Sequence, residues 1–261
     1  MFLILRTTPN IFFSILLLGC GIPGGEPRAP NLSAGPVNQL EIAGNACGPA
    51  ALLTSVKCGG ERWQKLAERL PGETDRSKML YIIRAHGLKP STSLRNRKRW
   101  TNDGVNMEDL SVIAGELSTL EGLPAPAMAG FLDGSTKKPE KTLRRLHSHL
   151  RKSLRRGFPP ILSVRRHVLR NGRWPALRGH FVTVVAVSER VPHGATSFQI
   201  TCFDPWKGRS LTGMVRIAAD TNTARVPSHL EIEMPGIRVG SSELKAGEHS
   251  HLVPAMALGL W

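Results

Sequence analysis

The sequence predicts an α+β fold, with helices first along the chain and an antiparallel sheet after them. Up to residue 156, apolar residues recur at helical spacing, and beyond it the chain changes to short β-branched runs broken by turn residues. Hydrophobic residues make up 41% of the 261 residues and charged residues 21%, which is an ordinary globular composition with enough chain for one substantial core. We therefore expect an N-terminal helical part and a C-terminal antiparallel β-sheet.

Five segments predict the helical part. They are 47–57, 61–70, 76–86, 107–120 and 139–156. The first has Pro49 in its first turn and a glycine pair beyond its end, as helix starts and stops require. The last repeats leucine every three or four residues on one face and carries lysines and arginines largely off that face. We interpret 93–104 as a basic loop and 121–138 as a Gly- and Pro-rich connector.

The sheet is predicted from five short runs rich in β-branched residues. They are 159–169, 180–190, 197–205, 213–219 and 229–235. Turn residues separate them, which is typical of antiparallel strands and hairpins. We find no internal repeat and expect a single domain over 36–261, with a basic insertion near 91–138.

The first residues predict export. Residues 1–19 hold one cation, Arg6, and an apolar run of about eight residues, too short to span a bilayer and typical of a signal peptide. The ending "LLGC" resembles the bacterial lipoprotein cleavage box, which implies that Cys20 is lipidated and that 20–35 is a flexible tether. A plain secretory signal is the alternative. We expect a lipoprotein of the cell membrane or outer membrane that faces the periplasm or the exterior.

The net charge of +15 favours acidic partners such as anionic lipid headgroups, cell-surface polymers or nucleic acid. The sequence has no recognisable nucleic-acid-reading motif and its first residues predict export from the cytoplasm, so we expect no specific nucleic-acid partner. A lipid on Cys20 and a basic surface would together give the two signals that stable membrane attachment needs.

The four cysteines are Cys20, Cys47, Cys58 and Cys202. None forms a CxxC pair, which argues against a zinc ribbon or a thioredoxin-type motif. If Cys20 carries lipid, a disulfide between Cys58 and Cys202 is the only one that leaves Cys47 free, and the sequence leaves its formation open. We expect no metal, since His147 and His149 are two apart on a predicted helix and point away from each other.

Cys47 is the candidate reactive side chain. It stands at the predicted start of a helix, where unsatisfied N–H groups and the positive end of the helix dipole favour thiolate over thiol. The small residues around it would let a substrate backbone approach. A buried structural cysteine would also suit this position, so a catalytic assignment needs a partner base.

His180 is the candidate base, because it opens the most apolar predicted strand and would be partly desolvated on a rigid element. Asp204 ends the next predicted strand, so a hairpin could bring its carboxylate to the imidazole and orient it. The alternatives are a histidine that is merely satisfied at a strand end and an Asp-Pro pair that only starts a turn.

Taken together, three stretches resemble the papain-like cysteine peptidases, in particular the branch with the bacteriocin-processing, double-glycine leader peptidases. "NACGPAALL" is similar to the nucleophile helix of that branch, "GHFVTVVAV" to its histidine strand and "FDPWKG" to its Asp-Pro segment. The resemblance implies a papain-like fold in which Cys47 is the nucleophile, His180 the general base and acid, and Asp204 the orienting residue.

The oxyanion donor departs from the family pattern. The family has a glutamine about six residues before the cysteine, whose amide helps the cysteine N–H bind the oxyanion. Here the nearest glutamine, Gln39, is eight positions before Cys47, and Asn45 lies closer. Gln39 is the expected donor and Asn45 the alternative.

The resemblance implies an exported, membrane-anchored, monomeric cysteine peptidase that hydrolyses peptides or proteins through an acyl-thioester and needs no cofactor. It covers about residues 36–90 and 139–210, and leaves the basic insertion and the tail after 212 unexplained. Two alternatives stay open. One is an acyltransferase or transglutaminase-like enzyme with the same three residues, and the other is a non-catalytic, anion-binding surface protein on this scaffold. The sequence does not identify the substrate.

Overall fold

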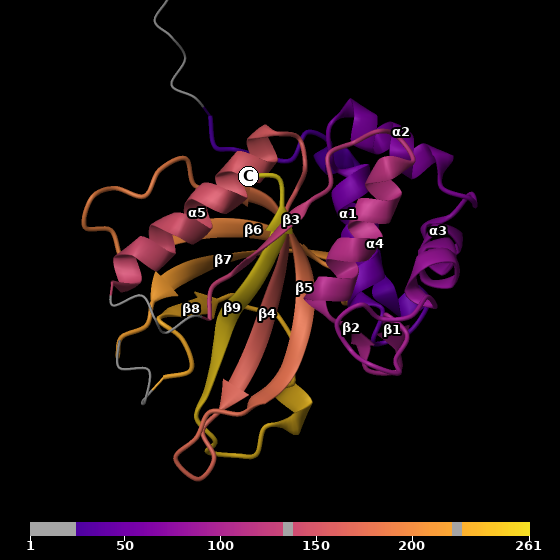
Figure 1. The fold of residues 1–261 in the computed structure, drawn as a ribbon. Coiled ribbons are helices and arrows are strands. Elements are labelled where there is room, and N and C mark those ends of the chain that lie inside the picture. The colour runs from indigo at the N-terminus through magenta and orange to yellow at the C-terminus, as the bar shows by residue number, and fades with distance from the viewer. Residues whose placement is uncertain (1–24, 133–137, 221–225) are drawn as a thin grey trace, which may run out of the picture.

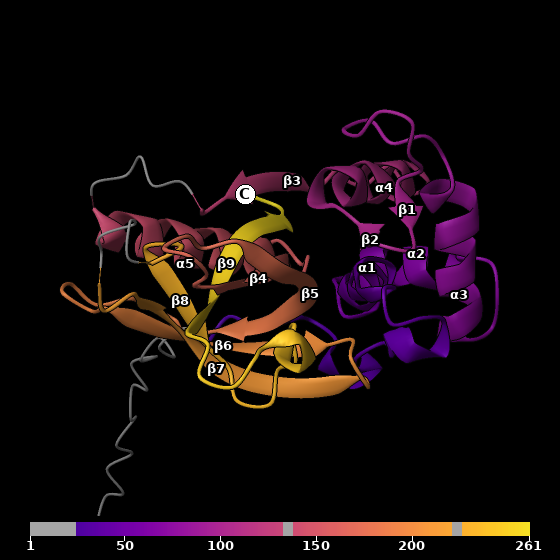
Figure 2. The ribbon, with the colours of Figure 1, turned by 90° about the horizontal axis from the view of Figure 1, so that it is seen from below.

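The structure is a computed structural model that describes residues 25–132, 138–220 and 226–261, and it confirms the α+β class. Figure 1 shows the helices α1 to α4 grouped on one side of the molecule and a large sheet on the other, with α5 lying along one face of the sheet. The turned view in Figure 2 shows the same separation into a helical half and a sheet half.

The predicted helices are all present, with small shifts at their ends. They are α1 (Cys47–Lys57), α2 (Glu61–Arg69), α3 (Asp75–Tyr81), α4 (Met107–Thr119) and α5 (Pro139–Arg155). A π-helical segment, Ile82–Gly87, continues α3. Side-chain caps fix two helix starts, because Thr74 caps α3 through Ser77 and Asn106 accepts from the Asp109 N–H at the start of α4.

Among the described residues the sheet has seven strands, all antiparallel, in the order β3-β9-β4-β5-β6-β7-β8. Their bounds are β3 (Ala127–Gly130), β4 (Ile161–Val168), β5 (Ala176–Val187), β6 (Ser197–Asp204), β7 (Arg209–Ile217), β8 (Leu230–Glu233) and β9 (Ser250–Gly259). Five of these strands follow the predicted runs. The alternating apolar residues of the inner strands bury one face against α5, which sets the register.

The strand β9 was not predicted, although it is an inner strand of the sheet, between the edge strand β3 and β4. The tail after 212 therefore completes the domain. Pro254 within this run disfavours a strand, because proline cannot donate to the ladder. The structure accommodates Pro254 opposite Val164, next to a register shift between Ser163 and Val164. The connector also holds an unpredicted edge strand, β3, and the basic loop forms a small hairpin from β1 (Trp100–Thr101) and β2 (Gly104–Val105).

Two apolar clusters form the core of the described part of the chain. One lies between α5 and the sheet, where the leucine stripe of the helix is fully buried. The other surrounds α1, in which every residue from Gly48 to Val56 is buried among α2, α4 and β5. Since each buried leucine or valine stabilises the fold by about 1.5–3 kcal/mol, α1 is fixed firmly inside the helical half.

The predicted signal peptide and Cys20 lie outside the described residues. The described part of the predicted tether packs on the domain, which corrects its assignment as a flexible segment. The Ala29 N–H donates to the Val185 carbonyl at 2.7 Å, the Asn31 N–H donates to the Cys58 carbonyl at 3.1 Å, and Ala29 is buried. The packed domain thus begins before residue 36, because this segment adds a bridge to the sheet. In the described part of the chain, no helix is long and apolar enough to cross a membrane.

Candidate functional site

Cys47 is the first residue of α1. Its N-cap residue, Ala46, makes no side-chain cap, so the first N–H groups of the helix are left for other partners. The sulfur accepts from the backbone N–H groups of Gly48 and Phe181. Both N–H groups favour a thiolate, because they donate to the charged form.

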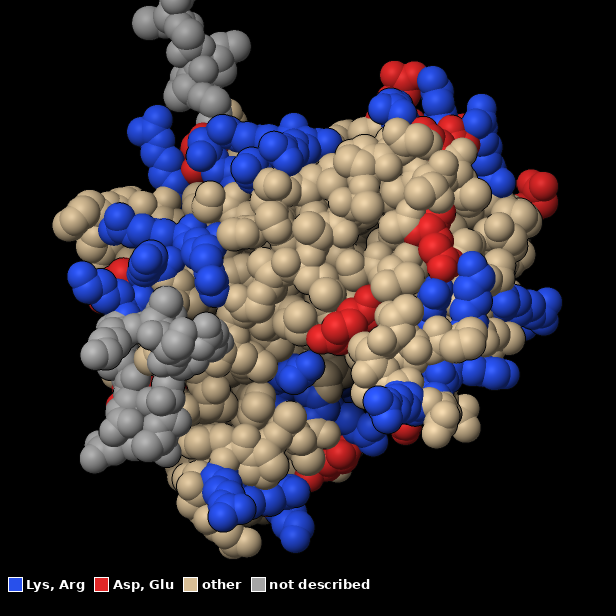
Figure 3. Space-filling view, viewed as in Figure 1, with Lys and Arg blue, Asp and Glu red and all other residues tan. Residues whose placement is uncertain are grey.

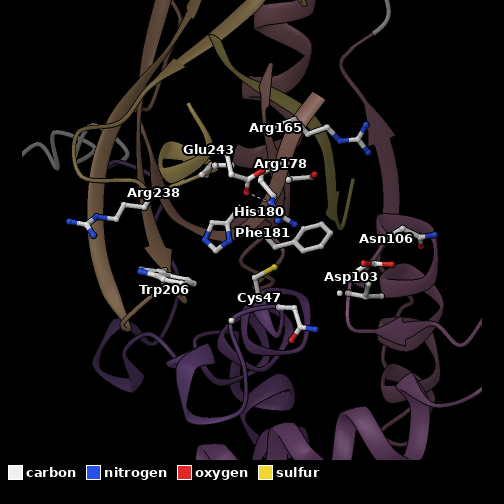
Figure 4. A pocket seen from close by; sticks show the side chains of 18 of the residues that line it. Cys47, Asp103, Asn106, Arg165, Arg178, His180, Phe181, Trp206, Arg238 and Glu243 are labelled. Carbon is white, nitrogen blue, oxygen red and sulfur yellow. Dashed lines mark hydrogen bonds and ion pairs between the residues drawn. The ribbon is translucent and has the colours of Figure 1, made fainter. Parts of the chain in front are cut away.

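His180 lies on β5 beside this helix start, and Figure 4 shows its imidazole next to the Cys47 side chain. A buried hydrogen bond ties the two elements together, since the Thr183 hydroxyl donates to the Ala51 carbonyl of α1 at 3.0 Å. The imidazole is buried except for 8% of the side-chain surface. The packing of β5 on α1 therefore brings His180 into hydrogen-bonding contact with Cys47.

Asp204 ends β6, which pairs with β5 in antiparallel register. The His180 Nε2 and the Asp204 Oδ1 are 2.7 Å apart, and the carboxylate is fully buried. The Nε2–H therefore donates to the carboxylate, which leaves Nδ1 for the sulfur. The structure thus brings Cys47, His180 and Asp204 into one connected group, from positions far apart in the sequence.

Further contacts hold the Asp204 carboxylate on both oxygens. Oδ1 also accepts from the Trp206 N–H at 2.9 Å, and Oδ2 accepts from the Arg209 Nη2 at 2.8 Å. Arg209 is itself fixed, because its guanidinium donates to the carbonyls of Trp206 and Gly236. Burial raises the pKa of Asp204, but the hydrogen bond and charge of His180, with those of Trp206 and Arg209, outweigh it and lower the pKa. The carboxylate stays ionised.

The electrostatics of the pair favour a thiolate and an imidazolium. Burial opposes the thiolate, but the hydrogen bond and charge of His180 lower the pKa of Cys47 below its usual value. Burial likewise opposes the imidazolium, but the hydrogen bonds to Asp204 and Cys47 raise the pKa of His180 to about 9. Both shifts favour a thiolate–imidazolium pair, which is the reactive form of a catalytic cysteine.

Gln39 and Asn45, the two candidate oxyanion donors, differ in their hydrogen bonds. Asn45 Nδ2 donates to the carbonyls of Thr101 at 3.0 Å and Asn102 at 2.8 Å, which uses both of its hydrogens. Gln39 is buried, and its Nε2 donates to the Gly44 carbonyl at 2.5 Å, which leaves one hydrogen free for another acceptor. Gln39 thus keeps a free amide hydrogen, whereas Asn45 lies on the cleft lining but has none to spare.

Cys47 and His180 open onto a cleft of about 940 Å³ between the two halves, and Asp204 lies buried behind them. One wall comes from 102–107 in the basic insertion, and the other from 238–243 in the C-terminal tail. Trp206 and Phe181 lie beside Cys47 and His180 in Figure 4. The two segments that the family resemblance leaves unexplained therefore build the walls of the cleft.

The basic loop that precedes α4 is held firmly against that helix. Asp109 accepts from the Ser91 hydroxyl at 2.6 Å and from the Thr92 N–H at 3.1 Å. Glu116 pairs with Arg99 and Lys89, each at 2.8 Å, and with His86. Burial opposes ionisation of Glu116, but these three partners outweigh it and lower its pKa to about 2. The cleft wall is thus fixed by buried and half-buried charges.

Gly48 lets the insertion approach the nucleophile. A Cβ on Gly48 would lie 2.3 Å from the Val105 Cγ1 of β2, which is far inside van der Waals contact. Only glycine permits β2 to pack against the first turn of α1 at this distance.

The other two cysteines in the described part of the chain are expected to be unreactive. Cys58 and Cys202 are buried free thiols, so no disulfide joins them. Burial raises the pKa of Cys58 to about 11 and raises that of Cys202 further. A buried thiol with a raised pKa reacts slowly. Among the described residues, no group of three or more His, Cys, Asp and Glu side chains could hold a metal ion.

Comparison of the chain with models of known protein families gives no match, and comparison with curated proteins gives no significant match. The family resemblance therefore rests on three short motifs, and the function has to be inferred from the chemistry of the site.

Sequence reasoning missed Arg209 and the cleft walls. Arg209 follows Asp204 by five residues across the β6–β7 turn, so a basic residue just after an Asp-Pro turn was the available signal. No pattern in the sequence could have predicted the cleft walls, because they come from two segments more than 130 residues apart, 102–107 and 238–243.

Proposed function

We propose that this protein is a cysteine peptidase that hydrolyses peptide bonds through Cys47, His180 and Asp204. The observation that carries the proposal is the connected thiol, imidazole and carboxylate, of which the thiol and the imidazole open onto a cleft large enough for a peptide. Their placement, with the nucleophile on a helix and the other two on an antiparallel sheet, supports a papain-like fold.

The first step forms the acyl-enzyme. The Cys47 thiolate attacks the peptide carbonyl carbon, and the carbonyl oxygen takes the negative charge. We assign stabilisation of that charge to the Cys47 N–H, at the positive end of α1, and to the Gln39 amide. When the carbon–nitrogen bond breaks, the His180 imidazolium gives its proton to the leaving amine, and an acyl-thioester remains on Cys47.

The second step releases the acid. His180, now neutral, takes a proton from a water molecule, whose oxygen attacks the thioester carbon. The carbon–sulfur bond breaks, the carboxylic acid leaves, and the thiolate and imidazolium are restored. Asp204 holds the ring in the orientation that both proton transfers need and stabilises its cationic form.

Alkylation by iodoacetamide tests the reactive pair. Cys47 is expected to react faster at neutral pH than an unactivated thiol, while buried Cys58 and Cys202 serve as internal controls. Peptide mapping by mass spectrometry identifies the modified cysteine. Alkylation of Cys47 at the rate of an ordinary thiol would contradict the proposal.

Digestion of a peptide library tests the reaction itself, with Cys47→Ala as the control. Pairs of products whose summed mass exceeds that of the peptide by one water for each cleaved bond support hydrolysis. If an added amine is incorporated instead, the enzyme is an acyltransferase on the same residues. Retention of anionic polymer or lipid with no effect of Cys47→Ala, and no cleavage, would favour the non-catalytic binding protein.

The location of this activity is a separate proposal. We propose an exported lipoprotein, on the sequence of residues 1–20 and on the basic surface. Figure 3 shows lysine and arginine side chains in several separate groups on the visible face, many of them along α5. Metabolic labelling with palmitate tests the lipid, and Cys20→Ser is expected to abolish the label. Labelling that persists in Cys20→Ser would overturn it.

A further inference from the structure

The cleft lining holds more cations than anions, and both anions are already ion-paired within the protein. The cations are Arg165, Arg178 and Arg238, and the anions are Asp103 and Glu243. We propose that the cleft selects peptides with acidic side chains on both sides of the bond that is cleaved. This inference rests on the proposed peptidase function, since it names the substrate class of that same site.

Arg165 is the cation closest in register to the reactive group. It lies on β4 opposite Gly179, which directly precedes His180 on β5. Its side chain is half-buried, and its Cγ would lie 3.9 Å from a Cβ on Gly179. Because Gly179 has no side chain, the face of the strand beside Arg165 stays open.

The Arg165 guanidinium has no hydrogen-bonding or ion-pair acceptor among residues 25–132, 138–220 and 226–261. A half-buried cation without a partner loses part of its hydration and gains nothing in return. A carboxylate of a bound peptide would supply the missing acceptor, and the planar guanidinium can hold it through two hydrogen bonds.

Both acidic residues of the lining are already paired within the protein. Glu243 accepts from the Arg178 guanidinium, and Asp103 lies 3.5 Å from Arg97. They therefore contribute little net negative charge to the cleft. Neither contact involves Arg165 or Arg238, so the excess positive charge of the cleft belongs to those two residues.

Arg165 and Arg238 lie on opposite sides of the reactive group. Figure 4 shows Arg165 on one side of Cys47 and His180 and Arg238 on the other, beyond Trp206. A peptide laid across Cys47 would thus have a cation near each of its ends. The net charge of +15 would attract the same peptides over a longer range and speed their association.

The test starts from a peptide that the library digest shows to be cleaved. Two versions of it are compared, one with glutamate and one with glutamine at the positions that flank the cleaved bond. At low ionic strength, wild-type protein is expected to cleave the glutamate peptide about threefold to tenfold more efficiently. The double variant Arg165→Gln, Arg238→Gln is expected to reduce that ratio to about one. Added salt should lower the wild-type ratio in the same direction.

Arg144→Gln is the matched control, because Arg144 is an exposed cation of α5 outside the cleft lining. It removes the same charge and should leave the ratio unchanged. A wild-type ratio of one or below, or a ratio that survives in the double variant, would overturn the proposal.

Binding to the Cys47→Ala variant separates this inference from the proposed function. Fluorescence anisotropy of the same two labelled peptides measures the charge preference without cleavage. If Cys47→Ala binds the glutamate peptide more tightly and the double substitution removes the difference, the acidic subsites stand even where no peptide is cleaved. Cleavage that depends on Cys47 but ignores peptide charge supports the peptidase and rejects the subsites.

Discussion

The helical half and the sheet half hold their reactive side chains by different interactions. Cys47 starts a helix whose next nine residues are buried, so apolar packing fixes the position of the sulfur. Asp204 and His180 are fixed by short hydrogen bonds between buried charged groups, with Arg209 behind them. Packing is tolerant of small polar changes but not of added volume, whereas a buried polar network fails when one partner is removed.

The largest effect is expected when the base is removed from the sheet half. His180→Ala should lower kcat/KM by about 10³-fold or more, because it removes both the proton carrier and the cation that stabilises the thiolate. Ultraviolet absorbance of the thiolate should fall with the activity. His193→Ala is the control, since His193 lies in an exposed loop, and it should change neither quantity.

A smaller effect is expected when volume is added to the helical half. Gly48→Ala would place a methyl group against Val105 and displace the first turn of α1, and a shift of about 1 Å at the reacting atoms can cost 10²-fold in rate. We also expect a loss of about 1–3 kcal/mol in the free energy of unfolding. Activity assays and thermal unfolding measure both changes.

Gly130→Ala is the matched control for that substitution. Nothing lies within 4 Å of a Cβ on Gly130, and its backbone does not require glycine. Its free energy of unfolding should stay within about 0.5 kcal/mol of the wild type. Equal stability and activity in Gly48→Ala would show that packing does not fix the nucleophile.

Arg209→Gln weakens the polar network of the sheet half without touching the reacting atoms. We expect kcat to fall about tenfold, because Asp204 loses a charged hydrogen bond and holds His180 less firmly. The carboxylate would then be less compensated, so the pKa of His180 should rise above its wild-type value of about 9.

The pH–rate profile distinguishes this effect from a general loss of structure. Wild-type activity should fall as pH rises through about 9, where the imidazolium loses its proton, and this limb should move upward in Arg209→Gln. Arg209→Lys keeps the charge and should restore most of the wild-type profile. An unshifted alkaline limb in Arg209→Gln would mean that Arg209 has only a structural role.

The smallest effect is expected in the cleft wall that belongs to the helical half. Glu116→Gln weakens the contacts to Arg99 and Lys89, so we expect KM to rise about threefold and stability at neutral pH to fall by about 1–2 kcal/mol. The pKa of Glu116 is lowered from 4.5 to about 2, so its stabilisation is complete above pH 4.5 and is lost as pH falls toward 2.

Urea unfolding at several pH values measures the Glu116 contribution. The difference between the wild type and Glu116→Gln should be largest at neutral pH and vanish near pH 2. A difference that is independent of pH would show that the Glu116 charge does not hold the insertion.

Local periodicity was sufficient for most of the fold. The buried faces of α1 and α5 repeat at helical spacing, and β5 and β6 are β-branched runs bounded by turns, so their positions could be predicted. The strands β9 and β3 could not be predicted. Pro254 and small residues interrupt the apolar pattern of β9, and β3 has only four residues. Both exist because neighbouring strands offer them a hydrogen-bonding edge.

By itself, the sequence determined the helices, five strands and the three residue types placed at a helix start, on a strand and at a strand end. The structure begins the strand of His180 at Ala176, four residues earlier than the apolar run predicted. Only the tertiary structure decided that the Cys47 sulfur lies in hydrogen-bonding contact with the His180 ring and that Arg209 donates to Asp204. It also decided that the insertion and the tail form the walls of the cleft. The physical reason is that periodicity reports which face of an element is apolar, which is a local property. Contacts between segments more than a hundred residues apart depend on how those faces pack.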